Sequence, residues 1–166
     1  MSRQKMTRDT IPEGFTLTLA AVDAIPVLLF GGSMILAGLL LKSTLFLLGA
    51  GLCLFAGCAK VIWKVIVVLR QRNVWWLFLQ MRILMPIGLV LMVIGVVTAG
   101  AALRSFLASA GRFPSAPFFA GGFVGMGLMA VFGFTLDSSD ARANWVEQLT
   151  NAAAQLCFFV GLLLML

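Results

Sequence analysis

The strongest constraint on this chain is a set of five long apolar runs that are separated by short polar breaks. The runs cover residues 15–41, 44–69, 77–103, 115–136 and 145–166. A helix needs about 20 mainly apolar residues to cross about 30 Å of hydrocarbon, and each run is long enough. A transmembrane β-barrel would show short segments of alternating polarity instead. The sequence therefore predicts an all-α fold, a multi-pass transmembrane helical bundle with five spans.

The composition agrees with a chain whose outer surface faces lipid. Of its 166 residues, 61% are hydrophobic and only 11% are charged, whereas a soluble domain needs a largely polar surface. We expect residues 1–14 to form a cytoplasmic tail and residues 15–166 to form a single integral membrane domain. The apolar run after the tail is much longer than a signal-peptide core and has no clear small-residue cleavage site, which favours an uncleaved first span.

The basic residues are distributed unequally between the two predicted sides of the membrane. The tail and the breaks on its side hold Arg3, Lys5, Arg8, Arg70, Arg72 and Arg142, and the opposite side holds Lys42, Arg104 and Arg112. Because cytoplasmic loops carry an excess of Lys and Arg, this asymmetry predicts a cytoplasmic N-terminus and an extracytoplasmic C-terminus, in a prokaryotic cytoplasmic (inner) membrane. The net charge of +6 does not indicate a nucleic-acid partner, since the charges sit at helix ends.

The residue types that most enzymes use are poorly represented. Histidine is absent, which removes histidine metal ligands and the commonest general base. Cys53 and Cys58 would point about 140° apart on a helix, so neither a disulfide nor a metal pair is expected between them. The two acids of "DSSD" at 137–140 are interpreted as helix caps. We therefore expect no metal and no cofactor, and an enzyme is the weakest of the candidate function classes.

The second run contains two lysines, Lys60 and Lys64, among Val, Ile, Leu and Trp. On a helical wheel, both fall with Gly49, Cys53 and Gly57 in a sector of about 80°. Small residues mark the faces on which membrane helices approach each other. We therefore expect the lysines on the packing face, opposite the large aliphatic residues. The alternative is that both lie near the membrane boundary and extend their ammonium groups to the headgroups.

Two other spans carry a charge close to a proline. Asp23 lies three residues before Pro26. A proline frees the carbonyl four residues earlier, which in a membrane must face protein or water, so Asp23 is predicted to face such a place. Arg82 lies four residues before Pro86 but points away from the small-residue face of its span. This favours a snorkelling Arg82 over a buried one.

A polar stripe begins the fifth run. It consists of Asn144, Glu147, Gln148, Asn151 and Gln155, spaced by three or four residues except between Glu147 and Gln148. Asn144 with Glu147 also fits a helix N-cap followed by an acid three residues on, which would explain Glu147 alone. Asn151 and Gln155 would then be interhelical hydrogen-bonding groups that contribute about 1 kcal/mol or less each.

The fourth run has no charged residue and contains Gly121 and Gly125, a G-x-x-x-G pair. This pattern indicates close contact between membrane helices. We interpret it as packing within the bundle, with a dimer face as the alternative.

The polar residues of the spans fall in the predicted cytoplasmic half of the membrane, where ionisable groups are costly and are candidates for a functional site. The candidate ligand-binding residues are Asp23, Lys60, Lys64, Arg82, Glu147, Asn151 and Gln155. We predict a cytoplasm-facing pocket between the first, second and fifth spans, in which the lysines attract an anionic group. Asp23 would balance one lysine or exchange a proton, and Asn151 and Gln155 would supply oriented hydrogen bonds.

Such a pocket predicts a membrane protein that binds or transports an anionic or polar small molecule, or a lipid headgroup, among its membrane lipids. Because five spans make a small bundle, a translocation path would favour a homo-oligomer. The alternative is a non-catalytic subunit that assembles with a larger membrane partner protein through its glycine-rich faces. The polar stripe would then contribute to docking.

Overall fold

The computed structural model describes residues 16–135 and 141–166, and this part of the chain contains six α-helices and no strand. The helices are α1 (Leu17–Leu40), α2 (Thr44–Arg70), α3 (Trp75–Thr98), α4 (Ala101–Ala110), α5 (Ser115–Thr135) and α6 (Ala141–Leu163). All except α4 are long and apolar enough to cross a membrane. The prediction of an all-α bundle with five spans is confirmed. The predicted tail and the segment 137–140 lie outside the described residues.

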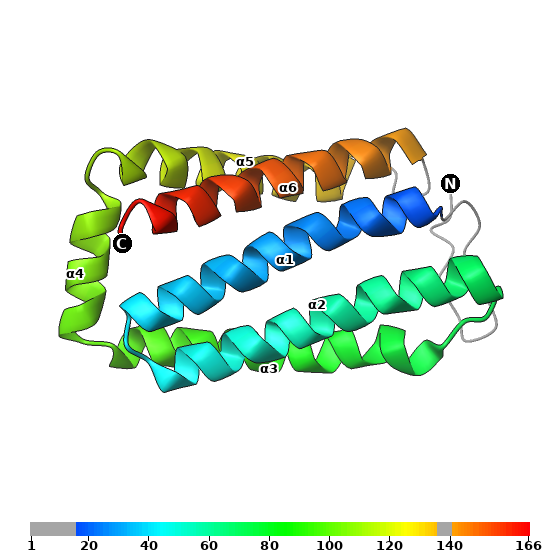
Figure 1. Cartoon of the computed structure of the whole chain (residues 1–166), viewed down its shortest axis with the longest axis horizontal. Helices are drawn as coiled ribbons and strands as arrows, with labels where there is room; N and C mark the ends of the chain where they lie inside the picture. Colours follow the sequence, from blue (N-terminus) through cyan, green and yellow to red (C-terminus); the bar gives the residue numbers. More distant parts are fainter. Residues whose placement is uncertain (1–15, 136–140) are drawn as a thin grey trace.

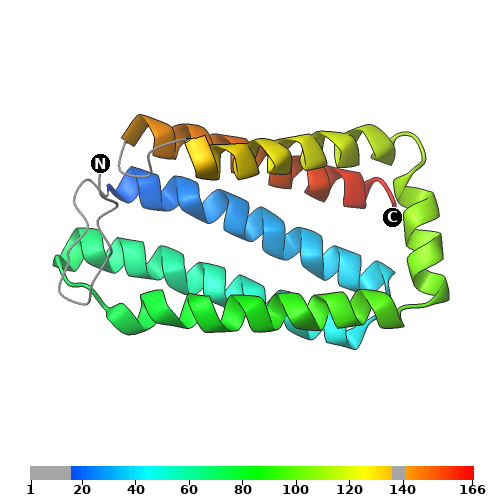
Figure 2. The same cartoon turned by 180° about the vertical axis from the view of Figure 1, so that it is seen from behind.

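The five long helices form two hairpins with α1 between them (Figure 1). Helix α2 packs on α3, α5 packs on α6, and α1 contacts both α2 and α6. The view from behind shows the same arrangement, with α4 standing across one end of the bundle between α3 and α5 (Figure 2). Helix α1 begins at the end away from α4, and α6 ends beside α4 (Figure 1). Helix α4 therefore marks one end of the bundle, and the start of α1 marks the other.

The predicted third span, residues 77–103, is wrong at its C-terminal end. Helix α3 ends at Thr98, and Gly100 has a φ of 55°, a left-handed conformation that suits glycine because it has no Cβ. The chain turns there and continues as α4 across the end of the bundle. Leu103 and Phe106 of α4 pack against the apolar core, while Leu107 is exposed. Much of the predicted connection after residue 103 is therefore helical.

Helices α2 and α3 pack closely against each other at glycines. A Cβ built on Gly49 would lie 2.4 Å from the carbonyl oxygen of Gly88, and one on Gly95 would lie 2.6 Å from the amide nitrogen of Phe46. The opposite face of α2 carries exposed Leu48 and Phe55. Large residues thus face lipid and small ones face the neighbouring helix, as the wheel predicted.

The G-x-x-x-G pair of α5 faces α6. A Cβ on Gly125 would lie 2.6 Å from Cβ of Ala154, and one on Gly121 would lie 3.5 Å from Sγ of Cys157. The pair therefore packs within the bundle, in agreement with the first of its two interpretations.

The apolar core lies in the half of the bundle near α4. Its buried members are Ala37, Leu41, Phe46, Ala50, Cys53, Met92 and Leu162. Buried Asp23 and Lys64 lie in the other half, since Asp23 is near the start of α1 and Lys64 is near the end of α2. The buried charges of the described residues thus lie in one half of the bundle, where Trp63 and Val67 are also buried.

Candidate functional site

A buried ion pair joins α1 to α2 in the half of the bundle away from α4. Lys64 Nζ donates a hydrogen bond to Oδ2 of Asp23, and only 10% and 7% of the two side chains, respectively, are exposed. Each charge alone would be costly away from water, and pairing offsets this cost. Of the two lysines, it is Lys64 that Asp23 contacts.

The pair forms where a glycine lets α1 approach α2 closely. A Cβ built on Gly57 would lie only 2.8 Å from Cγ1 of Val27. Asp23 lies about one helical turn before Val27, and Lys64 lies about two turns after Gly57. Because α1 and α2 run in opposite directions, both side chains are displaced toward the same end of the bundle and meet there.

Lys60 lies about one turn before Lys64 on the packing side of α2. It is half-buried, and the charges of Lys64 and Asp23 both act on it. With the residues that the structure describes, Lys60 forms no ion pair or hydrogen bond. Asp23, Lys60 and Lys64, called the charged cluster below, carry two positive charges and one negative. The cluster therefore has one positive charge in excess.

The first turn of α6 differs from the prediction. Helix α6 begins at Ala141, so Asn144 is a helical residue and not the N-cap. The capping interpretation of Glu147 is therefore wrong, because the helix starts three residues earlier than Asn144.

The polar side chains of α6 lie at different depths. Gln155 is buried, and its Nε2 lies 3.6 Å from Sδ of Met126 on α5. The Oε1 atoms of Gln155 and Gln148 are buried without a partner among the described residues, and Glu147 and Asn151 are half-buried. Within the described ranges, no hydrogen bond or ion pair links Glu147, Asn151 or Gln155 to the charged cluster. Buried amide oxygens normally have partners, so these two oxygens are positions for water or a polar ligand.

Arg82 belongs to an aromatic cluster on the α2–α3 hairpin. It is exposed, and its guanidinium lies over the ring of Phe78, 5.1 Å from the ring centre. The Phe78 ring also lies 5.2 Å from the rings of Trp63 and Trp75. Trp63 is buried, and its Nε1 donates a hydrogen bond to Oδ1 of Asn73 at 3.0 Å. The structure therefore places Arg82 on the outer surface of the hairpin and not in the charged cluster.

Gln80 of α3 is a polar residue of this region that the sequence interpretation missed. Its Nε2 donates to the carbonyl oxygens of Ala56 at 3.4 Å and Leu77 at 3.3 Å, and its Oε1 is buried without a partner among the described residues. Ala56 lies one turn before Lys60, so Gln80 borders the charged cluster from α3. Its only signal in the sequence is a single amide in an apolar run.

Comparison with known proteins found no family model, no curated protein and no solved structure that matches this chain. The chemistry of the site is therefore inferred from its own residues. The central observation is a neutralised buried ion pair beside a second lysine.

Proposed function

We propose that this protein binds an anionic small molecule or lipid headgroup at the charged cluster, from the side of the membrane that the basic residues predict to be cytoplasmic. The observation that supports the proposal is the excess charge of Lys60 beside the Asp23–Lys64 pair. An unbalanced lysine at the centre of a membrane helix costs about 2.5–3.5 kcal/mol on insertion scales. A bound anion would offset this cost, because it would supply the missing counter-charge.

The neighbouring residues suggest how such a ligand would be held. Lys60 would contact the anionic group directly, while Lys64 is already neutralised by Asp23. Asn151 from α6 would donate a hydrogen bond to the ligand, and Gln80 from α3, whose Nε2 already donates to two carbonyl oxygens, would accept one through its Oε1. Binding from one side is also the first step of transport, which would further require the site to open to the other side.

The proposal is tested by thermal unfolding of the purified protein in detergent, followed by tryptophan fluorescence. The two probes are inorganic phosphate and dioleoylphosphatidylglycerol, which represent a small anion and an anionic headgroup. A ligand that binds only the folded state stabilises it by about 2.7 kcal/mol at 100 times its Kd. We therefore expect at least one probe to raise the unfolding temperature of the wild type, and we expect K60Q to reduce this shift clearly, by the part that the charged cluster contributes.

The matched control is R82Q, which removes the same charge from an exposed residue on the neighbouring helix. It should keep the shift of the wild type. The proposal fails if neither probe stabilises the wild type, or if K60Q and R82Q retain equal shifts.

A second candidate function is assembly, either with a second copy of this chain or with a larger membrane partner. Gly51 and Gly127 lie exposed on α2 and α5, and a Cβ added at either would meet no atom within 4 Å. Small residues on an outer face allow another helix to approach closely. Light scattering of the solubilised protein separates the two functions. A monomer stabilised by a probe supports binding, whereas a stable larger assembly without such stabilisation supports a subunit role.

A further inference from the structure

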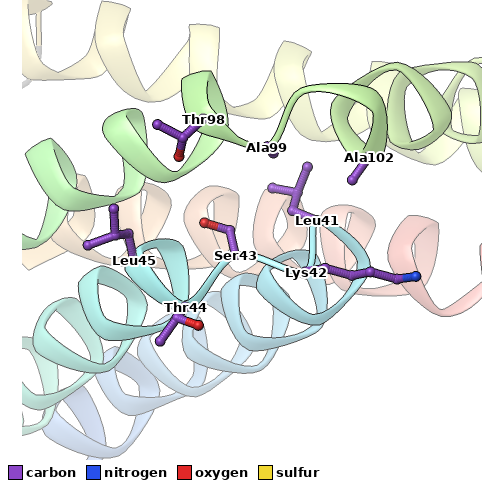
Figure 3. Close-up of a pocket in the computed structure, with 8 residues that line it drawn as sticks. All are labelled: Leu41, Lys42, Ser43, Thr44, Leu45, Thr98, Ala99 and Ala102. Carbon is purple, nitrogen blue, oxygen red and sulfur yellow. The ribbon is translucent and has the colours of Figure 1, made fainter.

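A pocket lies at the end of the bundle opposite the charged cluster, where the α1–α2 turn meets the bend between α3 and α4. Its volume is about 330 Å³. Figure 3 shows the turn residues Leu41, Lys42 and Ser43 on one side of it, and Thr98 and Ala102 on the other. Both polar and apolar side chains therefore line the pocket.

Ser43 gives this pocket a buried hydrogen-bond donor that the fold does not use. The residue is 9% exposed, and its Oγ accepts a hydrogen bond from the amide of Phe46 at 3.3 Å. Its own O–H meets no acceptor among the residues that the structure describes. The hydroxyl points from the turn toward the α3 side of the pocket (Figure 3). A buried donor normally has a partner, so the hydroxyl can donate to a water molecule or a ligand in the pocket.

The surroundings of the pocket are positively charged. Lys42 lines it, and exposed Arg104 and Arg112 lie at the same end of the bundle, on α4 and just after it. The acids of the described ranges, Asp23 and Glu147, are near the starts of α1 and α6, at the other end. A ligand in the pocket is therefore expected to be an anion.

We infer that this pocket binds the phosphate group of an anionic phospholipid from the leaflet at the α4 end. The Ser43 hydroxyl would donate to a phosphate oxygen. The Lys42 side chain extends outward from the turn (Figure 3), so its ammonium would meet the phosphate at the pocket mouth. Leu41 and Leu45 would contact the apolar part of the lipid next to the headgroup.

The position of the pocket favours a phospholipid over free phosphate. The pocket lies where α1 and α3 end and α2 begins, which is the level of the headgroups for helices that cross the membrane. Lysine and arginine side chains at this level can form charge-assisted hydrogen bonds with lipid phosphates. A free anion would make no contact with the apolar side chain of Leu45, which is 39% exposed.

The test is a titration of the purified protein with dioleoylphosphatidylglycerol and, separately, with dioleoylphosphatidylcholine, read by native mass spectrometry. The wild type should retain the anionic lipid in preference. K42Q should weaken this binding at least fivefold, and so should A102L, which fills the pocket without changing a charge. R112Q removes an equal charge from the same end but not from the pocket, and its affinity should stay within twofold of the wild type.

The same titration in the K60Q background distinguishes this site from the charged cluster. K42Q should cause the same loss of lipid affinity with and without K60Q. Equal weakening by K42Q and R112Q would overturn the inference, since it would indicate diffuse attraction of lipids to a basic surface. Binding that A102L leaves unchanged would also overturn it. If millimolar inorganic phosphate displaces the lipid, the pocket binds a phosphate group but does not select a phospholipid. This result would overturn the inference that the ligand is a phospholipid.

Discussion

Asp23 gives the two lysines of α2 different electrostatic environments. Lys64 is buried and paired with Asp23, whereas Lys60, one turn away, is half-buried and forms no ion pair within the described part of the chain. Membrane-embedded charges are usually either paired or part of a functional site. Because only Lys64 is paired with Asp23, the two lysines should respond differently to substitution.

Replacing Asp23 by Asn is expected to destabilise the protein by about 3–5 kcal/mol, because it removes one partner of a buried ion pair. Replacing Lys64 by Gln should cost less, since Lys60 lies close enough to balance the remaining carboxylate. Reversible unfolding in mixed detergent and SDS measures both losses, with R82Q as a nearly neutral control. Equal losses for D23N and K64Q would contradict the unequal roles of the two lysines.

The helical wheel of α2 predicted the face of the lysines but not their partner. Lys60 and Lys64 lie only about 40° apart around the helix, so both point toward neighbouring helices. The choice between them depends on the level at which Asp23 meets α2. That level is fixed by the contact between Val27 and Gly57, and a long-range contact of this kind has no signal in one sequence.

Helix α2 shows how position on the wheel decides the role of a glycine. Gly49 is buried against Gly88, where an added Cβ would lie 2.4 Å from a backbone oxygen. Gly51, two residues later, faces outward, and an added Cβ would meet nothing within 4 Å. Replacing either glycine by alanine adds the same methyl group to the chain. The two variants differ only in the atoms that surround this methyl group.

G49A is expected to lower the stability of the fold by about 1–3 kcal/mol, because the methyl group forces α2 and α3 apart. G51A should leave stability unchanged or raise it slightly, because alanine favours the helix. The thermal unfolding midpoints of the two variants in the same detergent make the comparison. A G49A variant as stable as G51A would show that α2 and α3 do not pack as closely as described.

The elements differ in how well the sequence predicts them. Length and hydropathy identify the five spans, because crossing a membrane requires about 20 apolar residues whatever the neighbours are. Helix α4 was missed, because residues 101–103 were assigned to the third span and residues 104–110, which include Arg104 and two serines, were interpreted as a polar break. Its separation from α3 depends on the backbone of Gly100, and many glycines in this chain lie within helices.

At the scale of the molecule, the buried charges of the described residues are confined to one half of the bundle. The charged cluster and Gln80 lie toward the end away from α4, and the apolar core lies toward α4. A ligand that reaches Lys60 would therefore enter from the end where α1 begins, which the basic residues predict to be cytoplasmic. The central claim is that water reaches Lys60 from this side although Lys60 lies within a membrane span.

This claim is tested most directly by the reaction of a cysteine at position 60 with a water-soluble, membrane-impermeant thiol reagent. The experiment uses inverted and right-side-out vesicles, and a background in which Cys53, Cys58 and Cys157 are replaced by Ala. The matched control is I62C. Ile62 is 52% exposed on the lipid-facing side of α2, yet it is two residues nearer than Lys60 to the end of the helix.

We expect K60C to react rapidly in inverted vesicles and slowly in right-side-out vesicles, while I62C remains nearly unreactive in both. Position 60 would then be more accessible to water than position 62, although it lies deeper in the membrane. This result requires a polar pocket at position 60. Unreactive K60C, or I62C that reacts as fast as K60C, would show instead that Lys60 faces lipid or only reaches up to the headgroups, and would contradict the proposed site.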